Sequence, residues 1–343
     1  TSNGDYNHIN GNCDWVYEEE FEFTKAYTWS AKGDYIAYYH FDQTAVPEFS
    51  FSNYTGLYPT EYRYKYPKAG EMNSIVDIFI YTIESDKTTR CKLGEETDIY
   101  IPRIHVHPNS NKLIVYRLNR LQNHLELLEV NTKNGHADVI YEETNKTYIE
   151  MNDNWLFLEK QNAFVFTSEK DGFQHIYKHD ITENNTTQIT KGKWEVSSIA
   201  GVNEETQLVY YMSSEVSPMD RNLFRIQWNG NEKVNLTPNK GVHDIHFSDD
   251  FTYFLDRYSS LNQPMISSIH NRQGELIRTL KDNTTLKNTM KNYALTDAEF
   301  MRIPNREGVE LNAWLIKPGS FDTNKKYPVL MFQYSGPGSQ EVM

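Results

Sequence analysis

Hydrophobic and polar residues alternate over short distances along this chain, and apolar stripes with helical spacing are scarce. Five segments share one arrangement: an aromatic or polar lead, a polar turn, and then four to six residues that favour strands. These segments are 28–39, 105–116, 157–166, 201–211 and 247–255. Because Gly, Asn and Asp tolerate the backbone geometry of tight turns, each segment predicts a β-hairpin.

The predicted turns recur along the chain near Gly33, Asn109, Gln161, Glu204 and Asp250. They are 76, 52, 43 and 46 residues apart, and the first spacing falls to 48 when the irregular segment 46–73 is set aside. A further short strand pair follows each hairpin, which brings each unit to about four strands, and a period of about 40 to 50 residues is typical of β-propeller blades. A mostly β fold with about five blades is therefore expected. A β-sandwich or an irregular all-β domain is the alternative.

Two regions break this rhythm. Segment 46–73 is rich in Tyr and Phe and carries three prolines, so it predicts an insertion that projects from a blade. Its exposed aromatic residues suit a protein contact, and a flap folded back on its own blade is the alternative.

From about residue 285 the pattern changes: 287–292 is a polar linker, 309–317 alternates like a strand, and 327–334 is continuously apolar like a buried strand of an α/β sheet. We therefore expect a propeller over residues 1–286 and the beginning of a second domain over 287–343.

Composition narrows the functional classes. The chain has 343 residues and a formal net charge of -13, without a basic run, so nucleic acid is not an expected partner. No apolar run approaches the length of a membrane span. The only two cysteines, Cys13 and Cys91, form either one bridge or two buried thiols. Neither a metal site nor a cofactor motif is recognisable, and no Gly-x-Ser-x-Gly nucleophile elbow occurs.

The sharpest chemical feature is the acidic run Glu18, Glu19 and Glu20, which lies between aromatic residues in the string DWVYEEEF. Like charges repel one another, and a bound cation would relieve that repulsion. An ammonium group offers three donors that two carboxylates can share through charge-assisted hydrogen bonds. A cation site therefore competes with the simpler interpretation, a solvated acidic run in the first turn of a helix.

A second feature is the string YSGPGSQ, which begins at Tyr334 and directly follows the apolar run. Loops that follow the strands of an α/β sheet carry ligand-binding groups. A Tyr hydroxyl in such a loop can donate to a developing oxyanion. The alternative is a Gly-Pro turn in which Tyr334 caps the strand.

Five strings together closely resemble the dipeptidyl peptidase IV family of serine peptidases. They are DWVYEEEF (14–21), TWSAKGDYIAYYHFD (28–42), YPKAG (66–70), ITKGKWEV (189–196) and YPVLMFQYSGPGSQ (327–340). The resemblance is collinear and covers nearly the whole chain. It implies an eight-bladed propeller followed by an α/β-hydrolase domain, located in the periplasm, the cell envelope or outside a bacterial cell.

The resemblance also implies roles for individual residues. Glu19 and Glu20 match the pair that binds the substrate's α-amine, and Glu18 is the less favoured contact. Tyr334 matches the Tyr that stabilises the oxyanion, and segment 46–73 matches the arm that helps to form the family's homodimer. The family removes N-terminal dipeptides with Pro or Ala at the second position.

The family pattern also has parts that this sequence does not contain. The Arg that supports the substrate carbonyl is expected before residue 1, and the Ser, Asp and His of the triad after residue 343. We therefore expect this chain alone to be inactive. A tripeptide-releasing relative, a non-catalytic propeller that binds peptides and a purely structural propeller are the competing functions.

Overall fold

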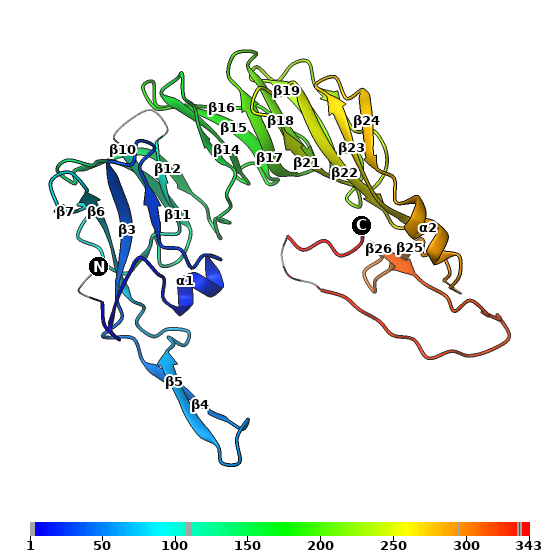
Figure 1. Ribbon diagram of the computed structural model, residues 1–343, viewed down its shortest axis with the longest axis horizontal. Helices are drawn as coiled ribbons and strands as arrows, with labels where there is room; N and C mark the ends of the chain where they lie inside the picture. The colour runs from blue at the N-terminus through cyan, green and yellow to red at the C-terminus, as the bar shows by residue number, and fades with distance from the viewer. Residues whose placement is uncertain (1–3, 108–111, 294, 335, 337) are drawn as a thin grey trace. The chain divides into compact units, whose positions relative to one another are not determined.

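The computed structural model describes residues 4–107, 112–293, 295–334, 336 and 338–343. Strands make up most of the regular structure, and the two helices in this part of the chain, α1 (Trp15–Glu20) and α2 (Thr284–Met290), are short. Figure 1 shows the strands grouped into successive sheets from blue to yellow along the chain. The mostly β fold predicted from the alternating pattern is confirmed.

Five sheets of four or five strands follow one another along the described residues. The first contains β1 (His8–Asn10), β2 (Tyr27–Trp29), β3 (Tyr35–Asp42), β6 (Ile75–Thr82) and β7 (Lys87–Arg90). The second contains β8 (Ile99–Tyr100), β9 (Ile104–Val106), β10 (Lys112–Asn119), β11 (His124–Asn131) and β12 (Ala137–Thr144). The third contains β13 (Trp155–Phe157), β14 (Ala163–Ser168), β15 (His175–Asp180) and β16 (Asn185–Gln188).

The fourth and fifth sheets repeat the four-stranded pattern. The fourth contains β17 (Val196–Asn203), β18 (Leu208–Ser213), β19 (Asn222–Gln227) and β20 (Val234–Asn235). The fifth contains β21 (Val242–Phe247), β22 (Tyr253–Ser260), β23 (Gln263–Asn271) and β24 (Leu276–Lys281). Consecutive four-stranded sheets of this kind are the blades of a β-propeller.

All five predicted hairpins are present. They are the pairs β2–β3, β9–β10, β13–β14, β17–β18 and β21–β22. In β3 the alternation is strict: Tyr35, Ala37, Tyr39 and Phe41 are buried, and the residues between them are partly exposed. Gly33 turns the chain between β2 and β3 with a φ of 72°, which a residue with a side chain rarely adopts. The turn predicted near Asn109 lies outside the described residues.

Contacts divide the chain into two compact units. We call residues 1–164 with 179–186 the N-unit, and residues 165–178 with 187–343 the C-unit. The third sheet contributes residues to both units. The predicted domain boundary at 286/287 is a different division of the chain, and it stays a prediction.

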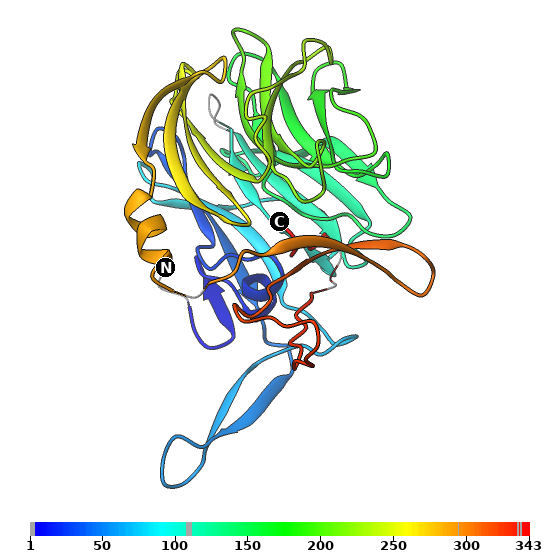
Figure 2. The ribbon, with the colours of Figure 1, turned by 90° about the vertical axis from the view of Figure 1, so that its right-hand side faces the viewer.

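Segment 46–73 forms a separate two-stranded sheet between β3 and β6, which pair directly with each other. Its strands are β4 (Glu48–Asn53) and β5 (Thr60–Lys65), and they extend away from the first sheet (Figures 1 and 2). The loop at the tip is open to solvent, with Tyr54 77%, Leu57 93% and Tyr58 79% exposed. The predicted projection is confirmed, and the alternative of a flap folded back on its blade is wrong.

The structure of residues 287–343 agrees with the predicted strand at 309–317 but not with the one at 327–334. β26 (Glu310–Leu315) lies within the predicted strand 309–317 and pairs with β25 (Glu299–Pro304), while part of the predicted linker 287–292 lies in α2. The expected buried strand at 327–334 is wrong for this structure: the segment has no strand, and its apolar side chains are 76–96% exposed at residues 329–332. A strand needs neighbours that complete its hydrogen bonds and cover its faces, and no described strand pairs with this segment.

Candidate functional site

Helix α1 is fixed at its N-terminal end by a buried carboxylate. Asp14 is the N-cap, and its Oδ1 accepts a hydrogen bond from the backbone N–H of Tyr17 at 3.0 Å. Its other oxygen, Oδ2, accepts a hydrogen bond from the Ser74 hydroxyl at 2.6 Å. Burial raises the pKa of Asp14 above its ordinary value. The cap satisfies a backbone donor at the helix end and ties α1 to the residue that precedes β6.

Tyr17 holds the buried face of α1. Its side chain is 2% exposed, and its hydroxyl oxygen accepts a hydrogen bond from the backbone N–H of Ile101 at 2.8 Å. Five aromatic rings surround it, with ring centroids 4.9 to 6.3 Å away: Phe21, Phe23, Tyr39, Phe41 and Tyr100. A six-residue helix is marginal in isolation, so this packing determines its orientation.

The acidic run occupies the solvent side of this anchored helix. Glu18, Glu19 and Glu20 are exposed, and α1 ends at Glu20. No ion pair or side-chain hydrogen bond joins these three to another described residue, and the last turn carries no basic residue. The partial negative charge of a helix C-terminus disfavours carboxylates, so Glu19 and Glu20 do not benefit from the helix dipole. The simpler interpretation of a solvated acidic run agrees with the exposure of all three residues, but only Glu18 lies in the first turn of the helix.

Tyr334 lies in the C-unit, whereas Glu19 and Glu20 lie in the N-unit. Tyr334 is 66% exposed, and its backbone belongs to no strand. The ring lies against the backbone at Gly336, where an added Cβ would come within 2.7 Å of Tyr334 Cε1. The glutamates and Tyr334 therefore belong to different units. Their proposed roles stay predictions.

Arg103 is a residue at this site that the sequence analysis missed. Its guanidinium donates to the backbone oxygen of Phe21, the C-cap of α1, and to Asp153. These partners are 82 and 50 residues away along the chain. No local motif marks such an interaction, because only the folded sheets bring the three segments together.

Both cysteines are free and buried, so the alternative of a disulfide bridge is wrong. The Cys13 thiol donates to the backbone oxygen of Phe23 at 2.9 Å. Burial raises the pKa of Cys13 to about 11 and that of Cys91 to about 12. Both therefore remain protonated thiols at neutral pH and are poor nucleophiles.

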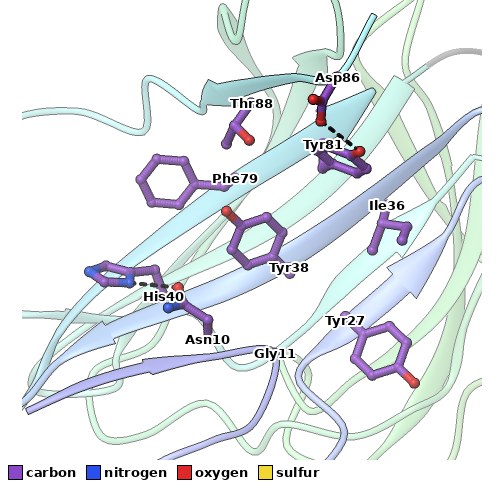
Figure 3. A pocket seen from close by; sticks show the side chains of 10 residues that line it. All are labelled: Asn10, Gly11, Tyr27, Ile36, Tyr38, His40, Phe79, Tyr81, Asp86 and Thr88. Atoms are coloured by element: carbon purple, nitrogen blue, oxygen red, sulfur yellow. Dashed lines mark hydrogen bonds between the residues drawn. The ribbon is translucent and has the colours of Figure 1, made fainter. Parts of the chain in front are cut away.

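A cavity of about 790 Å³ lies on the first sheet (Figure 3). Ile36, Tyr38 and His40 line it from β3, on the face opposite to Tyr39 and Phe41, which pack on Tyr17. His40 pairs with Asn10 at 2.8 Å. The cavity contains none of the predicted site residues.

The described residues contain neither a metal-binding cluster nor a membrane-spanning helix. No three His, Cys, Asp or Glu side chains among them are grouped so that they could hold a metal ion. In the same residues, neither helix has the length and apolar character needed to cross a membrane.

Comparison with known proteins identifies the family. Residues 1–265 match the family described as the dipeptidyl peptidase IV (DPP IV) N-terminal region. The solved structure of Porphyromonas gingivalis dipeptidyl peptidase 4 is 39% identical, with a TM-score of 0.92, over 100% of this chain and 49% of that one.

Curated relatives agree with this match. A probable dipeptidyl peptidase 4 of Aspergillus flavus is 27% identical over 100% of this chain and 47% of its own length. Dipeptidyl peptidase 4 of Felis catus is 31% identical over 99% of this chain and 48% of its own length. This chain therefore spans about half the length of these relatives, and it belongs to the family defined by the dipeptidyl peptidase IV N-terminal region.

Proposed function

We propose that this chain is the substrate-recognition part of a serine exopeptidase that releases N-terminal dipeptides of the X-Pro or X-Ala type. In this proposal Glu19 and Glu20 bind the free α-amine of the peptide. The observation that carries it is the anchored helix α1, which ends in exposed carboxylates that no described cation neutralises. The relatives named as dipeptidyl peptidases support the peptide substrate class.

The electrostatics favour an ammonium ligand. An α-amine has a pKa of about 8 and is mostly charged at neutral pH. Its three N–H donors satisfy two carboxylates at once, and such charge-assisted bonds are about twice as strong as neutral ones. Because Asp14 and Tyr17 hold α1, the backbone of the last turn, which carries the two glutamates, has a defined position in the N-unit. A fixed amine site sets the number of residues between the N-terminus and the bond that is cut.

Tyr334 has the second role in this proposal. Its hydroxyl donates to the oxyanion that forms when a Ser, activated by a His, attacks the second peptide bond. The Ser, Asp and His belong to a hydrolase domain, and residues 287–343 form the beginning of that domain. Tyr334 as a whole is 66% exposed.

Two further parts of the proposal concern the whole protein. The exposed aromatic tip of the 46–73 hairpin contributes to a homodimer, which is supported by its projection from the first sheet. A periplasmic, secreted or cell-envelope location is supported by the family resemblance alone.

The amine site is tested by charge removal in the full-length gene product. Glu19→Gln and Glu20→Gln each keep the size of the side chain and remove its charge. We expect each to lower kcat/KM for a Gly-Pro chromogenic substrate by about 10- to 100-fold, because a hydrogen bond to a charged group contributes roughly 1.5–3 kcal/mol. Glu18→Gln is the matched control on the same helix, with an expected change below about threefold.

The substrate provides the second half of this test. Wild type should cleave the free-amine substrate far better than its N-acetylated counterpart, because acetylation leaves both carboxylates without a cation. Mass spectrometry of a longer peptide should show dipeptides. Equal turnover of free and acetylated substrates would refute the amine site, and tripeptide products would favour the tripeptide-releasing alternative.

A further inference from the structure

The short loop between β8 and β9 contacts α1 at two places. The backbone N–H of Ile101 donates to the Tyr17 hydroxyl oxygen on the buried face of the helix. Two residues later, Arg103 Nη1 donates to the backbone oxygen of Phe21 at 2.8 Å. One loop of the second sheet therefore holds both the buried face and the C-terminal end of the helix that carries the acidic run.

The Arg103 guanidinium is itself held on several sides. Nη1 also donates to the oxygen of Pro102 at 2.8 Å, and Nε donates to Asp153 Oδ1 at 2.7 Å. Nη2 adds a longer bond of 3.4 Å to Asp153 Oδ2, and the guanidinium carbon lies 5.7 Å from the centroid of the Phe23 ring. Four hydrogen bonds to the protein leave one of the five N–H donors of the guanidinium. This arrangement suits a structural clamp better than a substrate ligand.

The charge of Arg103 matches its place at the helix end. The last carbonyl groups of a helix lack intrahelical partners and carry partial negative charge. Glu19 and Glu20 add two full negative charges to the same turn. A guanidinium bonded to the C-cap oxygen offsets part of this repulsion. Its side chain is 26% exposed, so solvent screens it less than a fully exposed cation.

We propose that Arg103 is a positioning residue for amine recognition, acting through the C-cap of α1, with Asp153 orienting its guanidinium. The inference rests on the proposed function of Glu19 and Glu20. Arg103 does not touch the substrate in this account. It holds the last turn of α1 so that the two carboxylates reach one amine.

A double-mutant cycle in the full-length protein tests this role. Arg103→Met should lower kcat/KM for the free-amine substrate roughly tenfold in the wild-type background, and less than about twofold when Glu19 and Glu20 are both Gln, because coupled residues are not additive. Arg103→Lys keeps the charge without the planar fork and should lose only about threefold.

Arg117→Met is the matched control. Arg117 donates to Glu126 and to the backbone oxygen of Leu93, and its side chain is 20% exposed, but it makes these contacts within the second sheet and its flanking loop. Its loss should change kcat/KM by a similar small factor in both backgrounds. Thermal melting of all variants monitors folding. If Arg103→Met does not fold, Asp153→Asn replaces it. This variant should lower kcat/KM about threefold when Glu19 and Glu20 are both present, and leave it nearly unchanged when both are Gln.

The outcomes separate the two proposals. If Glu19→Gln and Glu20→Gln leave kcat/KM unchanged, the proposed amine site fails. If they lower kcat/KM but Arg103→Met, or Asp153→Asn in its place, has no effect or lowers it equally in both backgrounds, the role of Arg103 is overturned and the amine site stands.

Discussion

At the scale of single residues, the site depends on buried polar groups that support an exposed acidic run. Asp14 and Tyr17 each satisfy a backbone N–H, and both belong to the same string as the glutamates. The sequence was enough to mark the acidic run, because it is contiguous with its aromatic neighbours, and the family resemblance then pointed to Glu19 and Glu20, whose role stays a prediction. It could not indicate Arg103, whose partners come from distant segments.

The contribution of the Tyr17 hydroxyl can be measured by substitution. Tyr17→Phe keeps the ring among its aromatic neighbours but leaves the buried N–H of Ile101 without its acceptor. We expect a loss of about 1–3 kcal/mol in the free energy of unfolding, measured by urea denaturation. Tyr35→Phe is the matched control in the N-unit, because the buried Tyr35 hydroxyl has no hydrogen-bond partner among the described residues. Equal midpoints for the two variants would contradict this account of how α1 is anchored.

At the scale of elements, the hairpins could be predicted because their signals are local. Alternation and turn residues specify β2–β3 and its four counterparts without knowledge of the rest of the chain. The apolar run 327–334 shows the limit of that reasoning. Its composition suits a buried strand, but a strand also requires partners, and those are a property of the assembled sheet. The helix α2 was missed because it is short and mostly polar, and none of its residues is buried.

The proposed role of the hairpin β4–β5 in a homodimer can be tested at its tip. Leu57, at its tip, is 93% exposed, and a charge placed there should oppose burial in a subunit interface. We expect Leu57→Asp to convert the full-length protein from dimer to monomer in size-exclusion chromatography with light scattering. Leu121→Asp, at a residue that is 74% exposed outside the hairpin, should remain dimeric. A monomeric wild type, or a variant at Leu57 that still dimerises, would refute the role of the hairpin.

At the scale of the whole molecule, the residues proposed for recognition and for chemistry belong to different parts of the chain. Glu19 and Glu20 belong to the N-unit, and Tyr334 belongs to the C-unit. The proposed function requires one peptide to reach both, with its amine at the glutamates and its second peptide bond at Tyr334. This requirement explains why a residue that orients α1 can affect catalysis without touching the bond that is cut.

The most direct test is a crystal structure of the full-length protein with a bound peptide that it cannot cleave. We expect the peptide's amine nitrogen to lie about 2.7–2.9 Å from a carboxylate oxygen of Glu19 and of Glu20, the usual length of charge-assisted bonds. An amine nitrogen held by other residues, with both glutamates in bulk solvent, would contradict the central claim.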